Sequence, residues 1–365
     1  MNKLLRNIII VGMLIIEAVF CCAVAQTKVS FAYDTDFLLY FDNREYDRTP
    51  PQRSQTIFGV RLAPEIGVQI ADSTESVHKL MAGVSYNQPF GASWGEITVK
   101  PTIYYRIETK GFDINLGFVP YRYLKETLPE YLLSDTISYY NANLQGALFQ
   151  YESDKGFASL MADWRGMYSK ETREAFRVIA TGQYKYKWFY TGGYAMLNHL
   201  ANNHYTNCVY DDIMLNPYIG FSLDYLIEPI DIFNIRLGYI GGYQRERATE
   251  TMFLTHAFNA ELTFRWRFLG LKQSFYYGDS LYPLYEKQKA TLNMGDPWYQ
   301  SKLYSRTDLY VYLYNNRFVN CYFSFNLHVN ETGNVNCQQQ LIAQFNLSQV
   351  FNKKDSPKLK SLLGK

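Results

Sequence analysis

Residues 256–268 read HAFNAELTFRWRF, and the spacing of apolar side chains in this stretch decides the fold. From Phe258 to Phe268 every second residue is apolar, while polar residues such as Glu261 and Arg265 lie between them. A repeat of two places successive side chains on opposite faces of a β-strand, whereas a helix repeats about every 3.6 residues. The stretch therefore predicts a long strand with one apolar and one polar face.

The same alternation recurs along the chain and predicts an all-β fold of about sixteen strands. The expected strands are 28–41, 55–70, 78–87, 96–108, 111–120, 143–151, 156–166, 175–186, 188–198, 212–226, 232–244, 253–267, 271–279, 302–314, 317–329 and 338–351. Three of them (143–151, 156–166 and 271–279) have mixed faces, so the count could lie between 14 and 18. A soluble sandwich would also show an apolar and a polar face. Strands this long, with charges in mid-strand, favour a wall that crosses a membrane.

The connections between these strands alternate between long and short. The odd-numbered ones, for example 121–142 and 280–301, run to roughly 22 residues, whereas turns such as 109–110 and 315–316 hold two. This asymmetry is typical of a closed antiparallel transmembrane barrel with short periplasmic turns and both termini in the periplasm. Because the first strand begins at residue 28, we expect no plug domain before it.

Composition excludes two other classes of protein. The formal charge is only +2 and charged residues make up 19% of the chain, so the basic surface of a nucleic-acid binder is missing. Beyond residue 25 no apolar run reaches the roughly 18 residues that a transmembrane helix needs. The 33 tyrosines and 24 phenylalanines instead suit a barrel with aromatic girdles in contact with outer-membrane lipid.

The chain is expected to divide into three segments. Residues 1–25 combine Lys3 and Arg6, an apolar stretch and an Ala-Val-Ala end, which is the pattern of a secretory signal peptide. Residues 26–351 would form the barrel. Residues 352–365 would form a periplasmic tail.

With this pattern and its last strand, QLIAQFNLSQVF (340–351), the chain resembles a Gram-negative outer-membrane porin and is similar to barrels of Bacteroidota-type outer membranes. The resemblance implies insertion by the barrel-assembly machinery and passive diffusion of small hydrophilic solutes. Porins usually end at a terminal Phe, whereas the tail 352–365 follows here, which puts the assembly signal in doubt. The oligomeric state stays open, homo-oligomers included.

In sixteen-stranded porins the third long loop narrows the lumen, so the resemblance implies a constriction formed by residues 121–142. Its carboxylates would face basic wall residues, giving the set Glu126, Glu130, Asp135, Arg61, Lys79 and Lys100. Opposed charges across a constriction orient polar solutes. Alternatively, the leucines of this segment make it a surface helix that caps the rim.

Other residues on the polar strand faces are expected to line the pore: Arg106, Tyr104, Arg177, Arg236, Glu261, Arg265, Arg306, Asp308, Tyr310 and Tyr322. All presumed inward positions together give twelve basic and ten acidic side chains, which predicts weak charge selectivity. The tyrosines offer apolar faces with hydroxyl groups, a surface that suits saccharides.

No catalytic, metal or cofactor site stands out in the sequence, so we expect a protein that is not an enzyme. Ser324, Asn326 and His328 share a strand face, but residues four apart lie about 13 Å apart and cannot hydrogen-bond directly. His199 and His204 are expected to be solvated groups near a long loop. Two alternatives remain open: a barrel whose external loops bind a partner or glycan, and an outer-membrane hydrolase.

Overall fold

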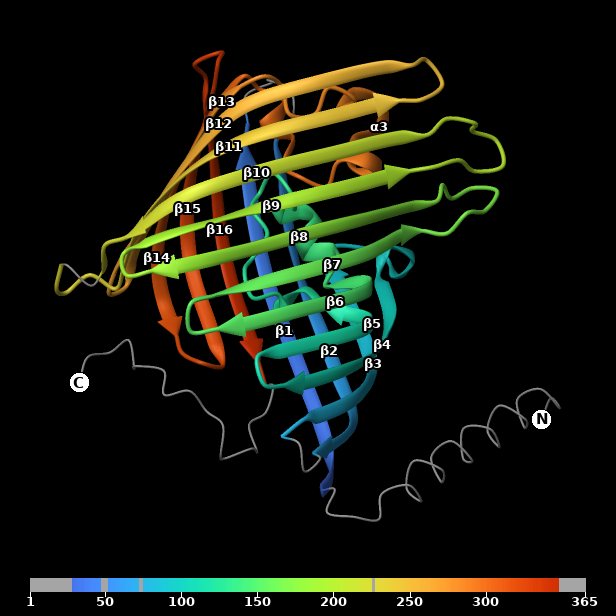
Figure 1. Ribbon diagram of the computed structural model, residues 1–365, viewed down its shortest axis with the longest axis vertical. Helices are drawn as coiled ribbons and strands as arrows, with labels where there is room; N and C mark the ends of the chain where they lie inside the picture. The colour runs from blue at the N-terminus through green and yellow to red at the C-terminus, as the bar shows by residue number, and fades with distance from the viewer. Residues whose placement is uncertain (1–27, 47–51, 72–74, 225–226, 348–365) are drawn as a thin grey trace.

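The computed structural model describes residues 28–46, 52–71, 75–224 and 227–347. These residues form a closed barrel of sixteen antiparallel strands, as Figure 1 shows. The fold class expected from the sequence is confirmed. The expected signal peptide (1–25) and tail (352–365) lie outside the described residues.

The strands follow one another around the barrel in chain order. Their bounds are β1 (Lys28–Glu45), β2 (Gln55–Ala71), β3 (Val77–Pro89), β4 (Thr98–Thr109), β5 (Phe112–Pro120), β6 (Asn143–Ser153), β7 (Gly156–Gly166), β8 (Ala175–Tyr186), β9 (Phe189–Leu200), β10 (Tyr210–Ser222), β11 (Ile232–Glu246), β12 (Thr251–Trp266), β13 (Leu269–Gly278), β14 (Leu303–Asn315), β15 (Val319–Asn330) and β16 (Val335–Asn346). A short 3₁₀ turn, η1 (Trp94–Glu96), lies between β3 and β4.

Pairing between the first and last strands closes the wall. β1 pairs with β16 from Asp36↔Asn346 to Glu45↔Cys337, and its other edge pairs with β2. Every strand therefore has two neighbours, which a membrane requires because an open sheet edge would leave backbone groups unpaired in lipid. β1 extends to Glu45, beyond the expected end at residue 41, because both neighbouring strands continue alongside it.

The alternation of side chains decides which residues meet lipid. Outward positions carry exposed apolar side chains, such as Leu254 and Phe258, whereas inward positions carry buried polar ones, such as Asp308 and Asn326. This arrangement is that of an outer-membrane barrel. Which membrane side the termini occupy stays a prediction.

Two long connections, which we call loop L3 (residues 121–142) and loop L7 (residues 279–302), fold into the lumen. L3 carries η2 (Tyr121–Tyr123) and α2 (Asp135–Tyr140), and L7 carries α3 (Tyr285–Leu292) and η4 (Pro297–Gln300). In Figure 1, α3 lies toward the end of the barrel where the long connections gather, which we call the long-loop end. The barrel thus fills part of its interior with its own loops.

Among the described residues, no helix is long and apolar enough to cross a membrane.

Candidate functional site

The carboxylates of loop L3 cross the lumen and pair with the far wall. Glu126 lies 2.7 Å from Arg236 on β11, Glu130 lies 2.5 Å from Lys272 on β13, and Asp135 lies 3.2 Å from Arg306 on β14. These three ion pairs hold the loop across the barrel. They are not the pairs expected from the sequence.

The expected partners lie on the wall from which L3 departs, and they bind other groups. Arg61 donates to the backbone oxygens of Ser138 and Tyr139 at 2.7 and 3.1 Å, Lys79 pairs with Glu108 at 2.6 Å, and Lys100 donates to the side chain of Asn141 at 2.8 Å. The expected pairing is wrong because the loop spans the lumen and carries its carboxylates past β2–β4. The role of these six residues as a constriction stays a prediction.

Loops L3 and L7 also bind each other. The Ser134 backbone N–H donates to Met294 O at 2.8 Å, and that of Asp296 donates to Glu130 O at 2.7 Å. The Tyr282 hydroxyl donates to the backbone oxygen of Tyr131. The two loops therefore form one inserted body.

An aromatic stack anchors L7 to the wall. The indole of Trp298 is 0% exposed and lies parallel to the rings of Tyr304 and His328, with centroids 5.8 and 5.5 Å away, while Tyr46 packs edge-on at 5.3 Å. Stacked and edge-on arrangements are the favourable geometries for aromatic rings. This part of the lumen is therefore packed by side chains.

The residues expected to line the pore all lie on inward strand positions, where most already have partners. Several of them bind carboxylates: Arg106 binds Asp113, Tyr104 binds Glu65, Arg236 binds Glu126, and Tyr310 binds Asp308. Arg306 binds both Asp135 and Asp308, and Arg177 donates to Leu132 O. Arg265 lies over the Tyr312 ring, and Tyr322 packs against the rings of Tyr310 and Tyr312. Glu261 faces the same interior, opposite Arg236 in the strand register. Their role in conduction stays a prediction.

The Ser324, Asn326 and His328 face is a buried hydrogen-bond network. His328 bonds Tyr304 through Nδ1 at 2.7 Å and Gln338 through Nε2 at 2.9 Å, whereas Ser324 donates to Gln340 at 3.1 Å. Both ring nitrogens of His328 are thus engaged, and Ser324 and His328 are each 0% exposed. The network stabilises the wall and offers no reachable nucleophile.

A different histidine has the geometry of a general base. His199 on β9 and Asp211 on β10 are register partners at the long-loop end, and His199 Nδ1 lies 2.9 Å from an Asp211 carboxylate oxygen. An ionised carboxylate only accepts hydrogen bonds, so it holds the imidazole proton on Nδ1 and leaves Nε2 with a free lone pair. Arg247 donates two hydrogen bonds of 2.7 and 2.9 Å to the same carboxylate, which fixes the orientation of Asp211.

This His199–Asp211 dyad lies on the outer face of the wall. Leu197 and Ile213, two residues below it on the same strands, are exposed apolar side chains on that face. Phe176 packs on the His199 ring at 5.0 Å, and Trp164 stacks on Phe176 at 5.3 Å. The dyad therefore continues an aromatic row of the kind found at membrane–water interfaces.

Sequence reasoning noted His199 as a surface group and missed Asp211. Both residues lie on the outward, otherwise apolar faces of the strands that flank the connection 201–209. Polar residues at such positions are unusual and could have indicated a site on the outer wall. Their contact depends on the β9–β10 register, which alternation alone does not define.

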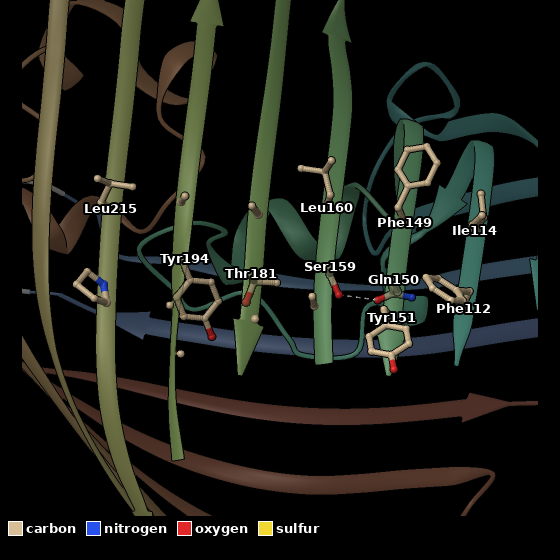
Figure 2. A pocket seen from close by; sticks show the side chains of 17 residues that line it. Phe112, Ile114, Phe149, Gln150, Tyr151, Ser159, Leu160, Thr181, Tyr194 and Leu215 are labelled. Carbon is tan, nitrogen blue, oxygen red and sulfur yellow. Dashed lines mark hydrogen bonds between the residues drawn. The ribbon is translucent and has the colours of Figure 1, made fainter. Parts of the chain in front are cut away.

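Below the dyad, the lipid-facing wall is hollowed into an apolar trough of about 880 Å³. Its floor consists of small residues on neighbouring strands: Ala158, Ala180, Gly182, Gly193 and Ala195. Larger side chains border it, and Figure 2 shows Leu215, Leu160, Phe149 and Ile114 across its width. Ala195 is four residues from His199 on the same strand, so the trough begins about 13 Å from the dyad.

With this geometry in place, comparison with known proteins assigns the family. Residues 25–356 match the model of the family described as lipid A 3'-O-deacylase-type. The chain belongs to this family. The expectation of a protein that is not an enzyme is therefore overturned, because the family is named after a deacylase, which is a hydrolytic enzyme. The search of curated proteins finds no match.

Solved structures with a similar fold are porins and porin-like barrels. OprD from Pseudomonas aeruginosa is 8% identical with a TM-score of 0.53, covering 87% of this chain and 94% of its own. Pseudomonas aeruginosa OpdL is 12% identical with a TM-score of 0.52, covering 88% and 99%. A loop-deletion mutant of Vibrio cholerae OmpT is 12% identical with a TM-score of 0.51, covering 88% and 100%. At these identities the likeness concerns the fold alone.

Proposed function

We propose that this protein is an outer-membrane esterase that removes an O-linked acyl chain from an acylated saccharide lipid of the lipid A type. The observation that carries the proposal is the His199–Asp211 dyad, which faces lipid in a chain of the deacylase family. The substrate reaches this face by diffusing sideways in the membrane. It does not need to enter the lumen.

The dyad would act as a general base on water. His199 Nε2 takes a proton from a water molecule, and the water oxygen attacks the ester carbonyl carbon to form a tetrahedral intermediate. The intermediate expels the sugar oxygen, which receives the proton from His199. The products are a free fatty acid and a saccharide hydroxyl group, and Asp211 stabilises the transient imidazolium. Water is the nucleophile because the described hydrogen bonds of His199 include no serine or cysteine.

The trough would hold the acyl chain that is being removed. It is lined almost entirely by apolar groups and lies in the same wall as the dyad. Each methylene group placed against such a surface contributes about 0.8 kcal/mol when it leaves water. In a bilayer the gain is smaller, so we expect the trough to orient the chain and position the ester more than to supply affinity.

Fatty-acid release from purified lipid A in detergent micelles, followed by mass spectrometry, tests the proposal. We expect the protein to remove an ester-linked chain, and His199→Ala to lower the rate by about 10²–10⁴-fold, the usual contribution of a general base. His204→Ala is the matched control, because His204 lies in the neighbouring long connection and contacts Tyr168, not a carboxylate. Full activity of His199→Ala, or no release by the folded wild type, would refute the assignment.

A narrow diffusion channel for small hydrophilic solutes, saccharides included, is the second candidate. The sixteen-strand fold shared with porins and the mixture of inward charges support it. The packed Trp298 stack counts against a wide pore. Planar-bilayer recording separates the cases: a channel gives steady ohmic steps with weak ion selectivity, which deletion of residues 124–134 enlarges. No conductance in either protein would eliminate this candidate.

A further inference from the structure

A second cavity lies at the rim of the barrel at the long-loop end, apart from the dyad and the trough. It measures about 920 Å³ and is bordered by residues of strands β3 to β8, inward ones such as Asp163 and outward ones such as Phe118, together with residues of L3 and L7. Three cationic side chains line it: Lys100 on β4, Arg165 on β7 and Arg173 in the connection after β7.

These cations bind neutral groups only. Lys100 donates to the Asn141 side chain at 2.8 Å, and Arg165 donates to the Asn198 side chain at 2.5 Å. Arg173 donates to backbone oxygens, with distances of 2.7 Å to Ala201 O and 2.6 Å to Cys208 O, and to the Gln288 side chain at 2.9 Å. Within the described part of the chain, none of the three enters an ion pair.

Arg165 also has an unused donor. Its Nε is buried and has no hydrogen-bond partner among the described residues. A buried guanidinium donor without an acceptor is costly, so such a group normally meets an anion or water. The donor lies in a side chain that borders the cavity.

Two carboxylates border the cavity, and within the described part of the chain neither forms an ion pair with the three cations. Asp163 already binds the Tyr121 hydroxyl at 2.8 Å, the Gln145 backbone N–H at 2.9 Å and Arg177 at 3.6 Å. Glu171 is exposed at the rim. In the lumen, cations such as Arg306 and Lys272 face carboxylates directly. In contrast, the three cations of the cavity have no carboxylate within ion-pair distance among the described residues.

We propose that this cavity binds a phosphate-type oxyanion. Two guanidinium groups and an ammonium group provide the donors that recognise phosphate oxygens, and arginine does so with paired N–H bonds. The anion can be a soluble phosphate or the phosphate of a lipid headgroup that reaches over the rim. The site rests on its own contacts and not on the esterase proposal.

Isothermal titration calorimetry on the full-length protein in a neutral detergent tests the site with two probes. The first is inorganic phosphate, and the second is phosphatidic acid in mixed micelles. Lys100→Gln and Arg165→Gln each remove one charge, and Lys170→Gln is the matched control because Lys170 is exposed on the same connection as Arg173 without lining the cavity. Heat-modifiable gel migration verifies that each barrel is folded.

We expect wild type to bind at least one probe, and Lys100→Gln and Arg165→Gln each to weaken binding by about tenfold, as loss of a charged hydrogen bond does. Lys170→Gln should bind like wild type. Binding of inorganic phosphate identifies a soluble anion, and binding of phosphatidic acid alone identifies a headgroup. If Arg165→Gln does not fold, Lys100→Gln alone decides. No binding of either probe at roughly 10 mM, or equal binding by all folded variants, overturns the proposal. His199→Ala should bind phosphate normally, so this result stays separate from the esterase test.

Discussion

Replacing Asp296 with asparagine should make the packing of loop L7 independent of pH in the mildly acidic range. Asp296 is 6% exposed, and its carboxylate accepts hydrogen bonds from the Trp298 backbone at 3.1 Å and the Gln52 side chain at 2.5 Å. Burial raises the pKa of Asp296 from 3.8 to about 6, although Arg306 and Arg44 lower it in part. Between pH 3.8 and about 6, Asp296 in the packed loop therefore keeps a proton that it would lose in a released, solvated loop.

The raised pKa determines the sign of the effect. Because the pKa is higher in the packed state than in the released state, the proton-linked stabilisation is fully present below pH 3.8 and is lost as the pH rises toward about 6. A shift of about two units corresponds to about 3 kcal/mol, or roughly 100-fold in the equilibrium between packed and released loop. Asparagine keeps a carbonyl oxygen for the Trp298 N–H but does not titrate in this window.

Hydrogen exchange with mass spectrometry, corrected for the intrinsic pH dependence of exchange, measures this equilibrium. Peptides from L7 in the wild type should lose protection by up to roughly 100-fold between pH 4 and pH 7, whereas Asp296→Asn should show a flat profile. Glu130 serves as an internal contrast, because its pKa is lowered to about 2 with Lys272 as the main stabilising neighbour. Its contribution to the stability of the packed loops is therefore lost only as the pH falls below 4.5. A flat wild-type profile, or the same slope in Asp296→Asn, would show that burial of this carboxyl group does not control the loop.

Two further changes test the trough and the aromatic stack. Ala195→Phe fills the trough and should lower kcat/KM at least tenfold for lipids with long acyl chains, since about two methylene groups lose their contact surface. The control Ala147→Phe, on the same outer face beyond the trough, should leave kcat/KM unchanged. Equal losses in both variants would argue against a chain-binding role. Trp298→Ala should cost about 3–5 kcal/mol in urea unfolding, because the indole is completely buried and packs against two parallel rings. A loss below about 1 kcal/mol would mean that the stack does not stabilise L7.

The wall could be predicted from the sequence because alternation is a property of single strands. Each strand needs only its own residues to define an outward and an inward face, and the long and short connections then indicate a closed barrel. Even the segments with mixed faces, such as 143–151, form strands close to the expected bounds, since pairing with both neighbours stabilises them.

The interior could not be predicted in the same way, because its contacts join residues far apart in the chain. Glu126 and Arg236 are separated by 110 positions, and Asp135 and Arg306 by 171. Which basic residue a loop carboxylate meets depends on where the loop crosses the closed barrel, and the alternation of the wall carries no information about that. The expected pairing with Arg61 was wrong for this reason, and the sequence left open whether the loop enters the lumen or caps the rim.

The two surfaces of the wall use polar groups for different purposes. Inside, buried ions and amides such as Arg306 and Gln338 are tied to loop or wall partners, as interior charges must be if burial is not to destabilise the fold. On the outer face, the side chains of His199 and Asp211 are not needed for the backbone pairing of β9 and β10. Aromatic or aliphatic residues at these positions would preserve the same strand pairing. The proposed esterase activity gives His199 and Asp211 a role there, because they lie on the same outer face as the trough of small residues that would hold an acyl chain.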